Sequence, residues 1–77
     1  MSDFSYDIKE SIAILSEKNG YTKELNLISY GGRPAKYDIR DWYTDEDGNK
    51  KMMKGITLSK EEAKELLEAL SGEELED

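Results

Sequence analysis

Residues 36–62, KYDIRDWYTDEDGNKKMMKGITLSKEE, have the patterns of a strand, a turn, a second strand and the start of a helix. From about Ala35 to Tyr43 the side chains alternate between two sets. One set is Tyr37, Ile39 and Tyr43, and the other is Lys36, Asp38, Arg40 and Trp42. Successive side chains of a strand point to opposite faces of a sheet, so this period of two predicts a strand with an apolar and an open polar face.

Downstream of this strand, the pair Asp47-Gly48 suits a two-residue hairpin turn into a fourth strand over about residues 50–57. Beyond Leu58 the period changes from two to nearly four. Ser59 and Glu62 have the spacing of a capping box, and Gly72 is a stop signal. The apolar residues between them are Ala63, Leu66, Leu67 and Leu70. The sequence therefore predicts a C-terminal helix with one apolar stripe over residues 59–71.

Upstream, Asn19-Gly20 is a second hairpin signal, and Gly31-Gly32-Arg33-Pro34 is a looser break. They separate strands expected at about residues 5–18 and 21–30, with a bend or bulge near Ala13. The predicted fold class is α+β: a four-stranded curved antiparallel sheet over residues 5–58, one helix over 59–71 and an acidic tail over 72–77. All of it is expected to form a single domain, residues 1–77.

The chain has 77 residues, no Cys and no His. A domain of this size has a thin core, and it cannot be reinforced here by a disulfide or a His/Cys-ligated metal. We therefore expect a homodimer. The same inventory excludes thiol and nucleophile–His chemistry, so we predict a protein that is not an enzyme and has no cofactor, metal or small-molecule substrate.

The N-terminal sequence MSDFSYDIKE has neither a basic region nor a long apolar run. It is therefore unlike a signal peptide or a membrane helix. We expect a cytoplasmic protein that does not contact membranes, associated with the nucleoid if it is bacterial.

The net charge of -7 is unevenly distributed. Residues 59–77 hold eight of the 18 acidic side chains, whereas residues 19–58 carry a net charge of +1. Because exposed charges are screened beyond about 10 Å at ~0.1 M salt, a basic surface in the middle of the chain remains compatible with phosphate binding.

Such a surface is predicted on the open face of the third strand, where two cations accompany Trp42. The cations are Lys36 and Arg40, and the fourth strand adds Lys50, Lys51 and Lys54. Cations follow phosphates and flat rings stack on unpaired bases, so this combination suits single-stranded nucleic acid. Three structural alternatives stay open: Trp42 is packing, Arg40 and Lys36 pair across strands with Asp38 or Glu24, and the three lysines only solubilise an edge.

The acidic turn at residues 45–49 also has the composition of a calcium loop. An EF-hand needs Gly at its sixth position and Glu at its twelfth, but Gly48 is fourth and Ile56 is twelfth. A hairpin turn explains Gly48 without calcium.

Residues 36–62 resemble the positive cofactor four family of transcriptional coactivators and its compact bacterial YdbC-like branch. The motifs are the aromatic-rich DIR strand, the acidic turn containing Gly, the KGITLS strand end and the Glu-rich helix start; KELNLISYGG is similar more loosely. The resemblance implies a dimer that binds single-stranded DNA across curved sheets. It assigns binding to Tyr30, Arg40, Trp42, Tyr43, Lys50 and Lys54.

Met53 departs from the pattern, since the coactivators carry a basic residue immediately before the position of Lys54. Trp42 and Tyr43 compete for the role of main stacking residue, and we favour Trp42, which shares a face with Arg40. Lys23 and Arg33 complete the candidate set. The sequence predicts a binder of single-stranded DNA, or RNA, with little sequence preference, acting in transcription, replication or repair. The alternative is a protein-interaction module that uses the acidic helix and tail.

Overall fold

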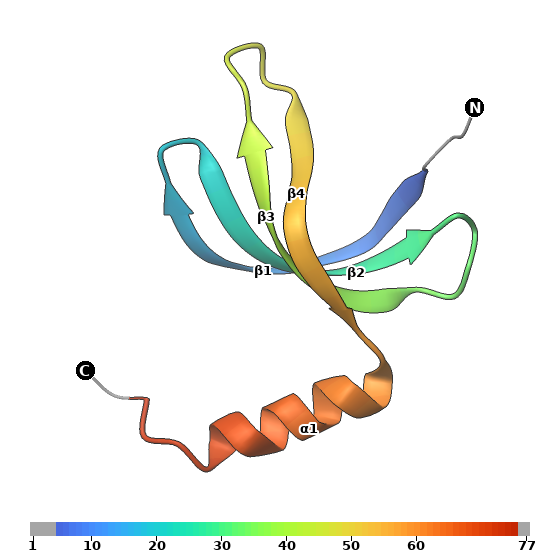
Figure 1. Cartoon of the computed structure of the whole chain (residues 1–77), viewed down its shortest axis with the longest axis vertical. Helices are drawn as coiled ribbons and strands as arrows, with labels where there is room; N and C mark the ends of the chain where they lie inside the picture. The colour runs from blue at the N-terminus through green and yellow to red at the C-terminus, as the bar shows by residue number, and fades with distance from the viewer. Residues whose placement is uncertain (1–4, 76–77) are drawn as a thin grey trace.

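A computed structural model describes residues 5–75 and contains four strands followed by one helix (Figure 1). The elements are β1 (Tyr6–Lys18), β2 (Tyr21–Tyr30), β3 (Lys36–Thr44), β4 (Lys50–Leu58) and α1 (Lys60–Ser71). The strands pair antiparallel in the order β1-β2-β3-β4. This is the predicted α+β fold, with strand limits within a residue of those expected.

The turn between β1 and β2 is the predicted tight hairpin. Asn19 and Gly20 have φ values of 53° and 84°, the left-handed conformation that this pair adopts easily. The two-residue turn predicted at Asp47-Gly48 is wrong, because the connection from β3 to β4 runs over residues 45–49. The Asp45 carboxylate accepts hydrogen bonds from the backbone N–H groups of Asp47 and Asn49, both at 2.9 Å, and this Asx turn sets the wider loop.

β1 contains the predicted irregularity, at three places rather than one. Its register against β2 shifts between Ile8 and Glu10, between Ser11 and Ala13, and between Ile14 and Ser16. A bulge inserts an extra residue into one strand and bends it. β1 therefore curls around the rest of the sheet.

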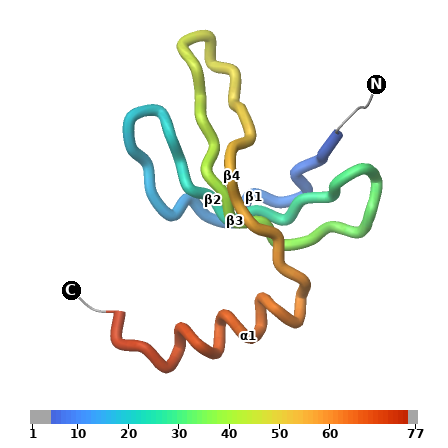
Figure 2. The backbone as a smooth tube through the Cα atoms, viewed as in Figure 1, coloured from blue at the N-terminus to red at the C-terminus, as the bar shows by residue number. Residues whose placement is uncertain are grey.

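The curvature is strong, as two ring positions show. Tyr6 is opposite Tyr30 and Trp42 is opposite Thr22, at the two ends of β2. Eight residues of a flat strand span about 26 Å, yet the ring centroids of Tyr6 and Trp42 are 5.8 Å apart. The sheet therefore folds over the face that carries both rings, which we call the concave face, and its bend is visible in Figure 2.

The concave face holds the most buried side chains of the described chain. Trp42 and Ile28 are fully buried, and the polar residues Asp38, Asn26 and Glu24 are buried beside them. All five alternate in phase along β2 and β3. The core is therefore partly polar, and it lies on the face that the sequence predicted to be open.

The helix lies below the opposite, convex face (Figure 1). Ser59 caps it: the Ser59 hydroxyl accepts from the Glu62 N–H at 3.1 Å, and the Glu62 carboxylate accepts from the Ser59 N–H at 2.8 Å, which confirms the capping box. No helical residue is buried. Within residues 5–75 this helix is too short and too polar to cross a membrane.

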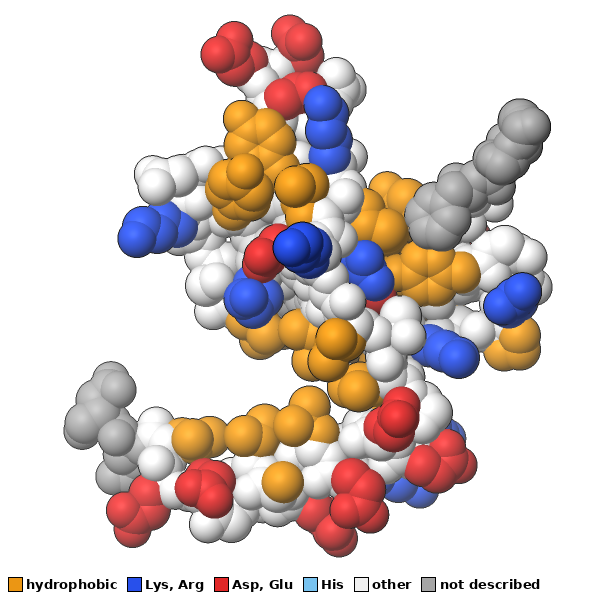
Figure 3. Space-filling model, in the orientation of Figure 1, with side chains coloured by type: hydrophobic (Ala, Val, Ile, Leu, Met, Phe, Trp, Pro, Cys, Tyr) orange, Lys and Arg blue, Asp and Glu red, His pale blue; other side chains and the backbone are white. Residues whose placement is uncertain are grey.

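Between helix and sheet lies an apolar groove of about 430 Å³. Its lining is Glu10, Ile12, Leu25, Tyr37, Ile39 and Leu58 from the sheet, with Ala63, Leu66, Leu67 and Leu70 from the helix. In Figure 3 apolar side chains run along the side of the helix toward the sheet, while acidic side chains occupy the far side. The predicted apolar stripe thus points at the sheet without being covered by it.

Candidate nucleic-acid interface

Trp42 is the core of the concave face rather than its surface. The Tyr6 ring lies 5.8 Å from the indole at an interplanar angle of 59°, and the Lys50 ammonium lies 5.1 Å above the indole centroid. The exposed fraction of Trp42 is 0%. The expectation that Trp42 presents an open stacking face is therefore wrong for the free chain, since a base needs one uncovered face of the ring.

Arg40 is fixed by Asp38, two residues away on β3. Nε of Arg40 donates to Oδ1 of Asp38 at 2.6 Å, Nη2 donates to Oδ2 at 2.7 Å, and Nη1 donates to the Met53 carbonyl on β4 at 3.0 Å. The Tyr30 hydroxyl donates to Oδ2 of the same carboxylate at 2.7 Å. The hydrogen bonds to Asp38 raise the pKa of Arg40, and burial together with the Asp38 bond raises the pKa of Tyr30 to about 12.

The expected role of Arg40 as a phosphate contact on an open face is corrected by this geometry. Three guanidinium N–H groups already have acceptors, and the side chain is mostly buried. Tyr30 has its hydroxyl engaged and its ring 5.9 Å below the guanidinium of Arg40. Arg40 pairs with Asp38, as the structural alternative had it, but the pair lies within β3 and not across strands.

Lys50 is held by Glu24 on β2, with its ammonium 2.9 Å from both carboxylate oxygens. Thr22 and Asn26 also donate to this carboxylate, at 2.6 and 3.3 Å. Burial opposes ionisation of Glu24, but the hydrogen bonds from Thr22, Lys50 and Asn26 outweigh it and lower the pKa below its ordinary value. Lys50 thus neutralises a buried acid in addition to lying above Trp42.

Three predicted cations remain exposed without an ion pair inside residues 5–75: Arg33, Lys36 and Lys54. Lys23 pairs with Asp41 at 3.3 Å and Lys51 with Asp45 at 4.0 Å, but both lysine side chains are more than half exposed. Exposed pairs contribute about 0–1 kcal/mol, so these two lysines are readily redirected to a phosphate.

A pair of rings lies on the convex face, at the end of the sheet that the helix does not reach. Tyr21 and Tyr43 are directly opposite each other on β2 and β3, with centroids 4.8 Å apart. Tyr21 is 45% exposed. Lys23 follows Tyr21 on the same face, and Lys51 is opposite Tyr43 on β4. We call these four residues the tyrosine arm.

Sequence reasoning missed Tyr21. The signal for it was the tight Asn19-Gly20 turn, which fixes Tyr21 as the first residue of β2 and gives it the phase of Leu25 and Leu27. Of Trp42 and Tyr43, the two candidates for the main stacking residue, Tyr43 is the one that is partly exposed.

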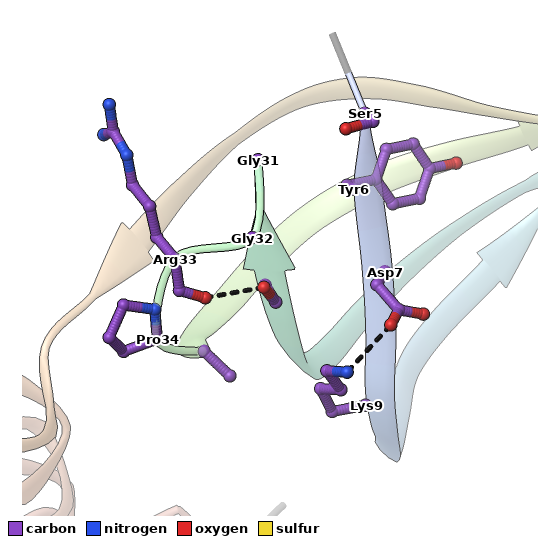
Figure 4. Close-up of a pocket in the computed structure, with 10 residues that line it drawn as sticks. Ser5, Tyr6, Asp7, Lys9, Gly31, Gly32, Arg33 and Pro34 are labelled. Atoms are coloured by element: carbon purple, nitrogen blue, oxygen red, sulfur yellow. Dashed lines mark hydrogen bonds and ion pairs between the residues drawn. The ribbon is translucent and has the colours of Figure 1, made fainter.

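The loop between β2 and β3 forms the rim of a second concavity of about 610 Å³ (Figure 4). The Gly31 N–H donates to the Ser5 carbonyl at 3.0 Å, and the Ser29 hydroxyl donates to the Arg33 carbonyl at 2.6 Å. Gly31 and Gly32 have φ values of 59° and 79°, which explains the glycine pair. Figure 4 shows the Arg33 side chain extending away from this loop.

The comparisons with known proteins agree with this architecture. Residues 17–69 match the sequence model of the transcriptional coactivator p15 (PC4) family. That segment runs from the end of β1 through most of α1. The chain is also 41% identical over 75 residues to an uncharacterised protein of Treponema pallidum (strain Nichols), covering 96% of this chain and 85% of that protein.

The matched segment includes both tyrosines of the arm, the Asp38–Arg40 pair and every exposed cation described above. It covers more than half of the chain. The chain therefore belongs to the family of the transcriptional coactivator p15 (PC4), a family of nucleic-acid-binding proteins.

Proposed function

We propose that this protein binds single-stranded nucleic acid with little dependence on base sequence. The observation that carries the proposal is the tyrosine arm, in which the exposed Tyr21 and the partly exposed Tyr43 share one sheet face with Lys23 and Lys51. Aromatic side chains stack on any base because every base has a π-face, and neighbouring cations follow the phosphates. Bases in a duplex are already stacked on one another, so the arm favours unpaired strands.

The unpaired cations Arg33, Lys36 and Lys54 extend the positive surface beyond the arm. Their binding energy would come from counterion release, with a slope of about -0.7 per neutralised phosphate when the logarithm of affinity is plotted against that of salt concentration. The acidic side chains of α1 lie on the side of the helix away from the sheet (Figure 3). Nucleic acid on the sheet is therefore kept apart from the most acidic part of the chain.

We also propose that the protein acts as a homodimer, in which a second copy covers the groove between α1 and the sheet. Leu67 is 67% exposed, and Leu66 and Leu70 are also exposed. An isolated helix of 12 residues is marginal in water and depends on burial of its apolar face. The convex residues Leu25, Tyr37 and Ile39 are only partly covered. A second copy offers the matching apolar surface, and a two-fold axis lets each helix cover the other subunit.

The stacking role is tested by titrating fluorescently labelled oligo-dT and following its anisotropy. Tyr43→Ala is expected to lose about 1–3 kcal/mol of affinity with the salt slope nearly unchanged, as for a lost stack. Lys51→Ala is expected instead to lower the slope by about 0.7. Leu15→Ala, which shortens an exposed side chain on β1 without removing a ring, is the matched control. Equal affinities for Tyr43→Ala and the control would remove the arm from the mechanism.

A further inference from the structure

The indole N–H of Trp42 is the one buried side-chain polar atom in the described part of the chain that has no hydrogen-bond partner. Buried donors are nearly always satisfied, because an unmade hydrogen bond inside a protein carries the full desolvation cost. The neighbouring polar groups on this face show the contrast, since Asp38 and Glu24 each receive several hydrogen bonds. The Trp42 N–H is therefore an exception that packing does not explain.

Trp42 lies only one layer of side chains below the solvent. Its cover includes Tyr6, which is 38% exposed, and Lys50, whose side chain is 43% exposed. Tyr6 is the first residue of β1, and β1 is an edge strand. Local opening costs least near the ends of edge strands, so the cover of Trp42 opens at the lowest cost at this end of β1. Movement of the Tyr6 ring would uncover part of the indole, since the two ring centroids are 5.8 Å apart.

The charges around Trp42 indicate what kind of acceptor would enter. The concave face carries three cations: Lys50 is balanced by the buried Glu24, Arg40 is balanced by the buried Asp38, and Lys36 lies at the other end of β3 from Trp42. A phosphate placed beside Trp42 would therefore meet two carboxylates whose charges are only just balanced. A neutral acceptor on the edge of a base avoids this repulsion. The rings of Trp42 and Tyr6 also offer an apolar surface to the plane of the base.

We propose that the Trp42 N–H donates a hydrogen bond to a base of the bound single strand, and that Tyr6 covers this donor in the free protein. The inference rests on the proposed function and deepens it. Trp42 then contributes through the edge of its ring and not through stacking. The tyrosine arm on the convex face and the Trp42 donor on the concave face become two separate contacts.

The chain has a single Trp, so the ¹H–¹⁵N spectrum of the labelled protein contains one indole cross-peak. Titration with oligo-dT is expected to move this peak downfield and to protect it from solvent exchange. A tract of the same length made of abasic sites is expected to leave it in place, because that tract has phosphates but no base acceptor. If oligo-dT binds by anisotropy and the peak does not move, the inference is wrong and the proposed function stands. If the abasic tract moves the peak, the acceptor is a phosphate and the base assignment is wrong. If oligo-dT does not bind at all, the proposed function itself fails.

Trp42→Phe removes the donor and keeps a ring. Its affinity for oligo-dT is expected to fall by about 3- to 10-fold, the factor that one neutral hydrogen bond contributes. Ile28→Val is the matched control, because it loosens the same core without removing a donor, and its affinity is expected to stay the same. Equal losses in both variants would assign the effect to packing and overturn the inference.

Tyr6→Ala is expected to make Trp42 more accessible to acrylamide, as measured by quenching of its fluorescence. The variant is also expected to bind oligo-dT at least as tightly as the wild type. Weaker binding would contradict the role of Tyr6 as a cover.

Discussion

Asp38 and Arg40 form a two-bond ion pair between residues two apart on β3, with Nε to Oδ1 at 2.6 Å and Nη2 to Oδ2 at 2.7 Å. The carboxylate is fully buried, and 14% of the Arg40 side chain is exposed. The third bond of Arg40, to the Met53 carbonyl, fastens β3 to the bulged part of β4. The pair thus holds the curved sheet in shape while leaving Arg40 little capacity for phosphate.

Replacement of Arg40 by Ala should destabilise the domain by about 3–5 kcal/mol, because it leaves the buried Asp38 charge uncompensated. Urea unfolding followed by circular dichroism measures the loss. Lys36→Ala, which removes an exposed cation from the same strand, should change stability by less than about 0.5 kcal/mol. If Arg40→Ala instead keeps its stability and loses only salt-dependent affinity, Arg40 is a phosphate contact after all.

Much of the fold was predictable because each part of it has a local cause. The Asn19-Gly20 turn, the capping box at Ser59 and the period of two along β3 all act over a few residues. The sequence also placed Trp42 and Arg40 correctly on the face of β3 opposite to Tyr43, since alternation gives the relative direction of neighbouring side chains.

The exposure of each face was not predictable in the same way. Alternation does not say which face the sheet bends toward, and the bend depends on three bulges in β1 and on the close approach of β4 at Gly55. Closure around the concave face buries Trp42, and Arg40 is occupied by Asp38, two residues away on the same face of β3. The face that was predicted to be open is therefore the core. The candidate residues for stacking on bases are Tyr43 and Tyr21.

Gly55 is required by space and not by backbone conformation. A Cβ at this position would lie 1.9 Å from the Arg40 Cβ and 2.6 Å from the Ile39 carbonyl oxygen. Gly55→Ala should therefore force β4 away from β3 and cost at least about 1–3 kcal/mol, the usual range for overpacking. Thermal unfolding measures this loss of stability. Gly72→Ala is the control, since its Cβ would meet nothing closer than 3.7 Å. Similar melting temperatures for the two variants would show that the strands separate freely at Gly55.

The free energy of unfolding should fall at acidic pH in part because Glu24 becomes protonated. Its pKa is lowered in the folded state, because hydrogen bonds from Thr22, Lys50 and Asn26 outweigh the effect of burial. A lowered pKa means that the stabilisation is present above the unfolded value, about 4.3–4.5, and is lost as the pH falls through the folded value. Urea midpoints measured between pH 7 and pH 2 should fall less steeply in Glu24→Gln than in the wild type. Glu17→Gln, an exposed acid on β1, should follow the wild-type curve; identical curves for all three proteins would contradict the coupling.

The proposed dimer depends on the exposed leucines of α1. Leu67→Lys places a charge where a second copy should pack, and it removes little intramolecular burial because Leu67 is 67% exposed. Sedimentation equilibrium should give a mass of twice 8.8 kDa for the wild type and 8.8 kDa for the variant, with the circular dichroism of the sheet retained. Lys64→Ala on the same helix is the control and should remain dimeric. A wild-type chain that is monomeric at micromolar concentration would remove the dimer from the account.

The most direct test of single-strand binding compares one labelled oligonucleotide of mixed sequence before and after annealing to its complement. Fluorescence anisotropy should show that the single strand binds more tightly than the duplex by at least 10-fold, about 1.4 kcal/mol or the stacking of one unpaired base. Raising the salt concentration should weaken both complexes and keep the preference for the single strand, because the slope per neutralised phosphate is about -0.9 for the duplex and about -0.7 for the single strand. Equal affinity for the two forms, or tighter binding of the duplex, would contradict the proposal that the tyrosine arm recognises unpaired bases.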